Sequence, residues 1–138
     1  MFSLQIKYLS FFFGLISVLS FFNIIYSYYL NLYLNLDTYY LSLIISFIIS
    51  VLFYKIKTTD KKSSIFEKIL TVFFGYLLIP LILSIPFYFS IYNLTFLDSY
   101  FEAISGFTST GFTIFENIKH IDQSLILWRS TTQWIGGL

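Results

Sequence analysis

The chain has 138 residues, of which 57% are apolar, 23% are aromatic and only 11% are charged, and it has no cysteine. A soluble domain of this size normally needs about a quarter charged residues to cover its surface, so the composition excludes a soluble class and predicts a polytopic membrane protein. The formal net charge of +1 is not the basic footprint of a nucleic-acid-binding protein, and the lack of cysteine removes disulfides, thiolate metal sites and cysteine nucleophiles.

Two uncharged runs in the first half of the chain are long enough to cross a bilayer. Residues 9–30 form a 22-residue run, about 33 Å long as a helix. This run is longer than the apolar region of a signal peptide and no small-x-small cleavage site follows it, so we expect a retained transmembrane helix rather than a cleaved signal. Residues 38–54 form a 17-residue run, about 26 Å long, with tyrosines at both ends, and predict a second span.

A lysine-rich segment follows the second run. Five of the eight basic residues of the chain fall between Lys55 and Lys68. Under the positive-inside rule this segment lies in the cytoplasm, so the N-terminus is cytoplasmic, the first span runs outward and the second returns. A docking site for a partner is the alternative interpretation of these lysines, and we favour the interpretation as topology.

A third span is expected to begin at Ile69, in a stretch that carries no charge until Asp98. This stretch is longer than one straight helix needs. Pro80 and Pro86 fall within it, and each removes a backbone donor, so we expect a kinked or tilted helix that ends near Tyr92 on the outer side.

The next helix is too short to span. Residues 96–105 predict a ten-residue helix, about 15 Å long, that begins at or is capped by Asp98 and is stopped by Gly106. We interpret it as a re-entrant helix, which is tolerated at membrane depth where it is buried in protein or lines a cavity. A helix on the membrane surface is the alternative.

The segment after this helix is a candidate ion filter. Residues 108–113 carry hydroxyl groups at four of six positions, and Gly111 frees the backbone. The C-terminal end of a re-entrant helix favours a cation, and the carbonyls of an extended strand can replace the water shell of an ion. The alternatives are that Gly111 is an ordinary turn glycine and that Thr108 only caps the helix end.

Two charges in this region are expected to meet inside the protein. Glu102 lies deep on the short helix and is costly there unless it is paired. Arg129, near the start of a last helix expected over residues 125–138, reaches a similar depth, so we predict an ion pair that braces the loop; the alternative is that Arg129 snorkels to the outer interface. The titratable residues of the intervening connection are expected to be solvated: Lys119, His120 and Asp122.

Two stretches resemble one known family. The sequence FEAISGFTSTGFTI at residues 101–114 resembles the first pore loop of the Trk/Ktr/HKT superfamily of potassium transporters, and LWRSTTQWIGGL at residues 127–138 resembles the start of the helix after that loop in TrkH-type subunits. The resemblance implies the N-terminal portion of such a subunit. Residues 1–64 would hold two N-terminal transmembrane helices and the basic cytoplasmic loop, and residues 65–138 a first pore repeat with a truncated inner helix.

The resemblance also implies the ion site. Four repeats surround one pore in this family, and each contributes a filter strand with a central glycine. The implied potassium filter residues are Thr108, Ser109, Thr110, Gly111 and Phe112. The implied supporting residues are Gly106, Thr113, Glu102 and Arg129. Sodium passage stays open as an alternative, because Thr113 replaces the second glycine of the potassium-channel signature.

By the same resemblance the function is potassium uptake across the bacterial inner (plasma) membrane, with K⁺ as the transported ion and no covalently bound cofactor. The implied partners are membrane lipid, a second copy in a homodimer and a TrkA/KtrA-like cytoplasmic nucleotide-binding regulatory subunit, with no nucleic acid. An enzyme is not expected, because no set of nucleophile, base and orienting group is recognisable. The chain is interpreted as an incomplete fragment; the alternative is a small polytopic membrane protein with an accessory or structural role and no transport by itself.

Overall fold

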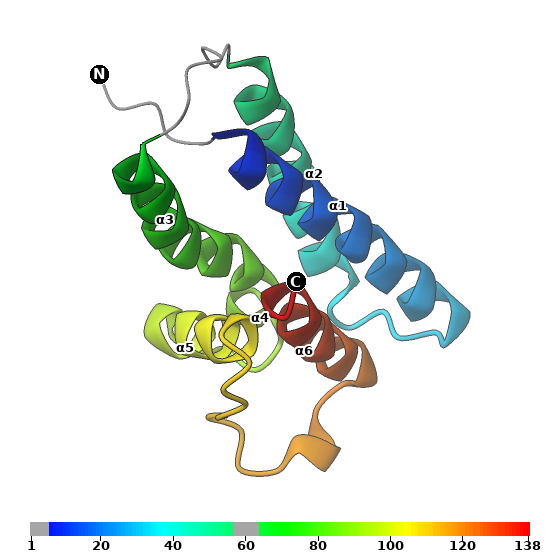
Figure 1. The fold of residues 1–138 in the computed structure, drawn as a ribbon. Coiled ribbons are helices and arrows are strands. Elements are labelled where there is room, and N and C mark those ends of the chain that lie inside the picture. Colours follow the sequence, from blue (N-terminus) through cyan, green and yellow to red (C-terminus); the bar gives the residue numbers. More distant parts are fainter. Residues whose placement is uncertain (1–5, 57–63) are drawn as a thin grey trace.

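The computed structural model describes residues 6–56 and 64–138, and within them the chain is helical without β-strands (Figure 1). The elements in chain order are α1 (Ile6–Tyr29), α2 (Leu36–Lys55), α3 (Ile65–Leu83), α4 (Ile85–Tyr88), α5 (Phe96–Phe107), the 3-10 helix η1 (Ile118–His120) and α6 (Gln123–Gly136). Three stretches are long and apolar enough to cross a membrane: α1, α2 and Ile65–Tyr88. The predicted all-α, polytopic class is confirmed.

Helices α1 and α2 form an antiparallel hairpin (Figure 1). Small hydroxyl side chains join the two helices. Ser10 and Ser50 exchange two hydrogen bonds, each from the hydroxyl of one residue to the backbone carbonyl of the other, at 2.9 and 2.8 Å. The hydroxyls of Ser20 and Ser42 lie 3.2 Å apart in a further hydrogen bond. Small residues let two helix backbones approach closely in lipid, and many of the larger apolar side chains of this hairpin face outward.

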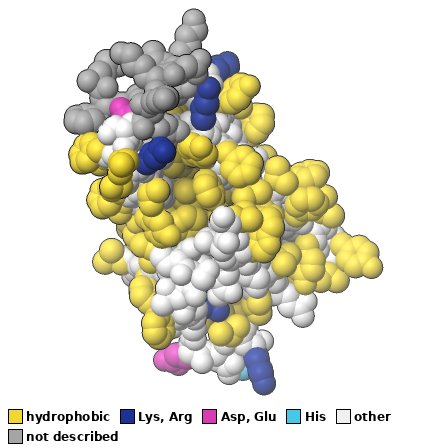
Figure 2. Space-filling view, in the orientation of Figure 1, with side chains coloured by type: hydrophobic (Ala, Val, Ile, Leu, Met, Phe, Trp, Pro, Cys, Tyr) yellow, Lys and Arg dark blue, Asp and Glu magenta, His cyan; other side chains and the backbone are white. Residues whose placement is uncertain are grey.

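The described lysines at the ends of α2 and α3 lie at one end of the molecule. Lys55 is in the last turn of α2, and Lys68 is in the first turn of α3; Figure 1 shows these helix ends beside the start of α1. The rest of the predicted lysine loop, residues 57–63, lies outside the described residues. Between the charged groups at the two ends of the molecule, hydrophobic side chains cover much of the face in Figure 2, as expected of helices that contact lipid.

Helix α3 begins four residues before the predicted Ile69, because its first turn is capped. Ser64 Oγ accepts a hydrogen bond from Phe66 N at 3.4 Å, and Glu67 Oε2 accepts one from Ser64 N at 3.2 Å. This capping box satisfies backbone donors that the start of a helix otherwise leaves free. The charged first turn therefore belongs to the helix rather than to the loop before it.

The third span is interrupted between its two prolines. Pro80 lies inside α3, the helix is interrupted at Ser84, and Pro86 occupies the first turn of α4, where a missing N–H costs little. The span ends at Tyr88 rather than near the predicted Tyr92.

Helix α6 packs against the spanning helices through a buried tryptophan. Trp128 is fully buried, its ring centroid lies 5.9 Å from that of Tyr39 in α2, and its Nε1 donates a hydrogen bond to Leu83 O at 3.0 Å. Figure 1 shows α5 as a short helix near the end of α3, followed by a loop that runs to η1 before α6 returns. Helix α6 is thus fixed to both α2 and α3.

Candidate functional site

The start of α5 is set by a threonine. Thr95 Oγ1 accepts a hydrogen bond from Asp98 N at 3.2 Å and donates one to Asp98 Oδ2 at 2.6 Å. Thr95 is therefore the N-cap, and the expectation that Asp98 caps the helix is wrong. Asp98 still favours the helix start, because a carboxylate in the first turn complements the helix dipole.

The end of α5 differs from the expected glycine stop. Gly106 lies inside the helix, Thr108 is the C-cap, and Ser109 takes the left-handed conformation with φ 55°. Ser109 N donates to Gly106 O at 2.8 Å and Thr110 N donates to Ser105 O at 3.0 Å, the hydrogen-bond pattern of a Schellman motif. The expectation that Gly106 stops the helix is thus wrong, since the helix ends at Phe107, two residues beyond the predicted end, and a serine occupies the place usually taken by glycine.

Replacing Ser109 with glycine is expected to stabilise the chain by about 0.5–1 kcal/mol. A left-handed non-glycine residue costs about 1–2 kcal/mol, and glycine loses about 0.5–1 kcal/mol in unfolded-state entropy. The midpoint of denaturant unfolding in detergent measures the gain. Thr110→Gly is the matched control, because Thr110 has no left-handed conformation to relieve; equal effects of both variants would contradict the strain at Ser109.

Helices α5 and α6 approach closely at two glycines. A Cβ added to Gly106 would overlap Thr132 Oγ1, and one added to Gly136 would overlap the backbone of Phe107. Gly106 is therefore needed for contact between helices rather than for its backbone freedom. The neighbouring Gly137 makes only ordinary contacts, with the nearest atom 3.6 Å from such a Cβ.

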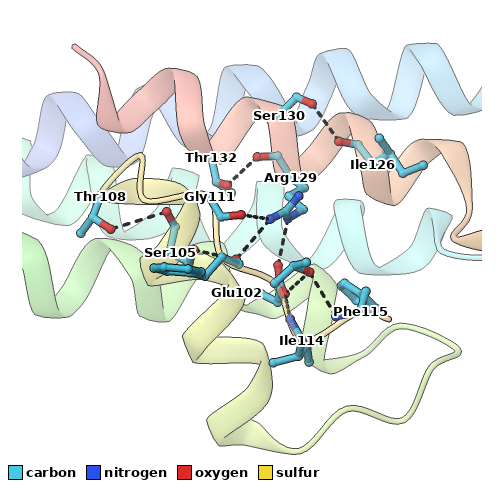
Figure 3. Close-up of polar contacts among 12 residues, drawn as sticks. Glu102, Ser105, Thr108, Gly111, Ile114, Phe115, Ile126, Arg129, Ser130 and Thr132 are labelled. Carbon is cyan, nitrogen blue, oxygen red and sulfur yellow. Dashed lines mark hydrogen bonds and ion pairs between the residues drawn. The ribbon is translucent and has the colours of Figure 1, made fainter. Parts of the chain in front are cut away.

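A buried ion pair joins α5 to α6, as predicted (Figure 3). Arg129 Nε donates to Glu102 Oε2 at 3.0 Å, and the Glu102 side chain is fully buried. The other carboxylate oxygen, Oε1, accepts from Thr113 Oγ1 and from Ile114 N, both at 2.6 Å. Both oxygens of this buried carboxylate are therefore satisfied, as a buried charge requires.

The guanidinium of Arg129 also holds the loop after α5 (Figure 3). Its Nη2 donates to Gly111 O at 3.0 Å and to Phe112 O at 3.2 Å. Phe112 O accepts a second hydrogen bond from Ser105 Oγ at 2.7 Å, a contact that the sequence did not indicate. A planar guanidinium can serve a carboxylate and two carbonyls together, which a lysine ammonium does less well.

The five predicted filter residues thus divide into two groups. The carbonyls of Gly111 and Phe112 point to Arg129, whereas in the described part of the chain no hydrogen bond ends on the carbonyls of Thr108, Ser109 or Thr110. All five residues are exposed, and Gly111 has a φ of 81°, which a residue with a Cβ rarely adopts. Arg129 therefore binds the loop at residues 111–112, whereas the backbone carbonyls of the hydroxyl-rich residues 108–110 stay free to accept.

The sequence is similar to those of several known membrane transport proteins. It is 36% identical over 107 residues to the Trk system potassium uptake protein TrkG of Escherichia coli (strain K12), covering 70% of this chain and 22% of that protein. It is 28% identical over 127 residues to an uncharacterized cation transporter of Methanocaldococcus jannaschii, MJ1485, covering 91% and 27%. It is 37% identical over 60 residues to the Trk system potassium uptake protein TrkI of Halomonas elongata, covering 44% and 11%.

This chain belongs to the Trk-type transporter family. It spans about a quarter or less of the length of these relatives. No family model matches it, and no solved structure matches it significantly. The relatives are named for uptake or transport, so the expectation that the chain is not an enzyme is confirmed at the level of the family.

In this Trk-type chain, Asp122 differs from its expected role. Asp122 is not a solvated loop residue: it is the N-cap of α6, and its carboxylate accepts from Ser124 N at 3.3 Å and from Asn35 Nδ2 at 2.8 Å. An aspartate directly before an apolar periodic run is a known cap signal, and it could have indicated this role. Lys119 and His120 are exposed, as expected.

Proposed function

We propose that this chain supplies one wall of a potassium pathway in a Trk-type transporter, with residues 108–113 as one filter segment. The observation that carries the proposal is the Arg129 clamp. A fully buried carboxylate and its arginine hold the loop at Gly111 and Phe112 and leave the carbonyls of 108–110 free to face an ion. The relatives named as potassium uptake proteins support K⁺ as the transported ion.

The chemistry is ion coordination by backbone oxygens. The C-terminal end of α5 carries a partial negative charge beside the loop, and carbonyl oxygens at fixed positions replace the water shell of a cation. One loop cannot enclose an ion, so the complete ring needs further segments. We propose that other parts of a longer transporter supply them, which accords with the fraction of its relatives that this chain spans.

We further propose a plasma-membrane location with the lysine end of the molecule in the cytoplasm. Lys55 and Lys68 lie at the same end as the start of α1, which supports this orientation under the positive-inside rule. A homodimer and a cytoplasmic nucleotide-binding regulatory subunit are proposed from the family resemblance. The repeat division, residues 1–64 as an N-terminal pair and 65–138 as a pore repeat, is proposed on the same ground.

Replacing Gly111 with alanine tests the filter assignment. Expressed from the complete coding sequence in cells that lack potassium uptake, the wild type is expected to restore growth at low K⁺ and to take up Rb⁺. Gly111→Ala is expected to lower uptake at least about tenfold or to relax the K⁺/Na⁺ ratio, because a Cβ at φ 81° costs about 1–2 kcal/mol and shifts the loop.

The matched control is Gly75→Ala in α3, where the added Cβ makes ordinary contacts of 3.5 Å or more. It is expected to keep wild-type uptake. Unchanged uptake and selectivity in Gly111→Ala would overturn the filter assignment. Absence of uptake by the wild type itself would favour the accessory role instead.

A further inference from the structure

A buried amide ties together three segments that are far apart in the chain. Asn35, between α1 and α2, is 1% exposed. Its Oδ1 accepts a hydrogen bond from Ile91 N at 3.2 Å, in the segment between α4 and α5, and its Nδ2 donates to Asp122 Oδ2 at 2.8 Å, at the start of α6. Both halves of the amide are therefore used in contacts that fix one segment against another.

Asp122 extends this contact into a polar cluster. Ser124 Oγ donates to Asp122 Oδ2 at 2.7 Å, and the hydroxyl of Tyr39 lies 2.9 Å from Ser124 Oγ. Because the Ser124 hydrogen is directed to the carboxylate, the Tyr39 hydroxyl is the donor in the second bond. Asp122 N donates to the Tyr92 hydroxyl at 2.7 Å. We call these five residues the outer junction: Asn35, Tyr39, Tyr92, Asp122 and Ser124.

The outer junction does more than cap α6. A capping aspartate needs no buried amide, and burying Asn35 is costly unless its polar atoms are paired. What the extra contacts add is a fixed relation between α2 and α6. One turn after Ser124, the Trp128 ring packs on Tyr39, so the same tyrosine holds α6 by its hydroxyl and by its ring.

The residue that follows Trp128 is the arginine of the clamp. Arg129 stands seven residues after Asp122, about 10 Å along the helix axis. The height and rotation of α6 at the outer junction therefore set where the guanidinium meets Gly111 O and Phe112 O. Among the described residues, no hydrogen bond joins α2 to this loop directly.

We propose that the outer junction positions Arg129, so that α2 holds the filter loop in register without touching the ion. Only one of its two tests, the measurement of the K⁺/Na⁺ uptake ratio, rests on the proposed function. Asn35, Tyr39 and Asp122 are thus positioning residues for the loop 108–113.

An exchange of the two polar groups tests the proposal. Asn35→Asp places two carboxylates face to face, and Asp122→Asn leaves one of three donors without its acceptor, because an amide offers one oxygen where the carboxylate offers two: Asn35 Nδ2, Ile91 N or Ser124 N. In the double variant Asn35→Asp/Asp122→Asn the acceptor for Ile91 N and the bond between positions 35 and 122 are both restored. A milder variant, Tyr39→Phe, keeps the ring on Trp128 and removes only the hydroxyl.

The placement of α6 can be read without transport. Ser109 Oγ lies 3.4 Å from Gln133 O, so the loop and α6 are close there, and the chain has no cysteine of its own. In a Ser109→Cys/Gln133→Cys background, the rate of oxidant-catalysed disulfide formation in membranes reports the register of α6. We expect Asn35→Asp and Asp122→Asn each to slow the rate of disulfide formation at least about tenfold, which corresponds to the loss of one hydrogen bond to a charged group. We expect the double variant to restore the rate.

The second readout is the K⁺/Na⁺ uptake ratio per molecule of protein in the membrane. We expect it to fall several-fold in the single variants and in Tyr39→Phe, and to recover in the double variant. An unchanged disulfide rate in folded single variants, or a ratio unaffected while only protein quantity falls, would overturn the proposal. If the wild type carries no potassium, the proposed function fails, and the disulfide rates still decide whether the outer junction positions α6.

Discussion

Replacing Arg129 with methionine is expected to destabilise the chain by about 3–5 kcal/mol, the usual cost of leaving a buried charge without its partner. Glu102 is fully buried and would lose its only ion pair among the described residues. The carbonyls of Gly111 and Phe112 would lose their donor at the same time, so the loop would loosen as the helices separate. Denaturant unfolding of the purified chain in detergent, followed by circular dichroism, measures the loss.

Two further variants divide this effect. Arg129→Lys is expected to cost less, because an ammonium neutralises Glu102 but cannot serve the carboxylate and two carbonyls in one geometry. Exchanging the charges, Glu102→Arg with Arg129→Glu, is expected to fail as a rescue, because Thr113 Oγ1 and Ile114 N need an acceptor that arginine lacks.

Lys119→Met is the control for loss of one basic side chain, since Lys119 is exposed in the 3-10 helix η1 before α6. It is expected to change stability by no more than about 0.5 kcal/mol. If Arg129→Met cost no more than Lys119→Met, the ion pair would not brace the loop.

Replacing Gly136 with alanine is expected to have the second large effect, at or above the upper end of the usual range of about 1–3 kcal/mol for overpacking. The added Cβ would overlap three atoms of Phe107: the carbonyl oxygen, the carbonyl carbon and Cα. These are backbone atoms at the last residue of α5, so they cannot rotate away as a side chain could. The end of α6 would have to move off α5, and thermal unfolding in detergent measures the cost.

Gly137→Ala is the matched control, one residue along the same chain. An added Cβ there lies 3.6 Å or more from its neighbours, so the variant is expected to stay near wild type. Equal stability of the two alanine variants would contradict the close contact between α5 and α6.

Much of the fold was predictable because the membrane imposes length and polarity on each span. The runs that became α1 and α2 were located within a few residues, and the two prolines indicated an irregularity in the third span, which the structure places at Ser84. The start of α3 was misplaced because Glu67 and Lys68 were assigned to the loop on charge, while the cap at Ser64 keeps them helical. The start of α3 is therefore set by the hydrogen bonds of the capping box and not by where the charged residues fall in the sequence.

The ion pair of the site was predictable, because burying a charge without a partner is energetically costly. The direction in which the loop carbonyls point was not predictable. A carboxylate inside the protein needs a partner, and Arg129 was the cation at a matching depth, so the pair with Glu102 could be predicted. Which way the carbonyls of Gly111 and Phe112 point is a property of the folded loop and has no sequence signal. The helix stop was assigned to Gly106, whereas the structure has Thr108 as the C-cap and the left-handed Ser109 after it.

The serine contacts between α1 and α2 bear on the order of assembly. Every hydrogen bond between Ser10 and Ser50, and between Ser20 and Ser42, is made within the hairpin itself. The hairpin can therefore close as soon as its two helices have entered the bilayer, while the later helices are still being synthesised. Helix α6, which follows α1 to α5 in the chain, then docks on a surface that is already formed, and its arginine completes the loop that precedes it.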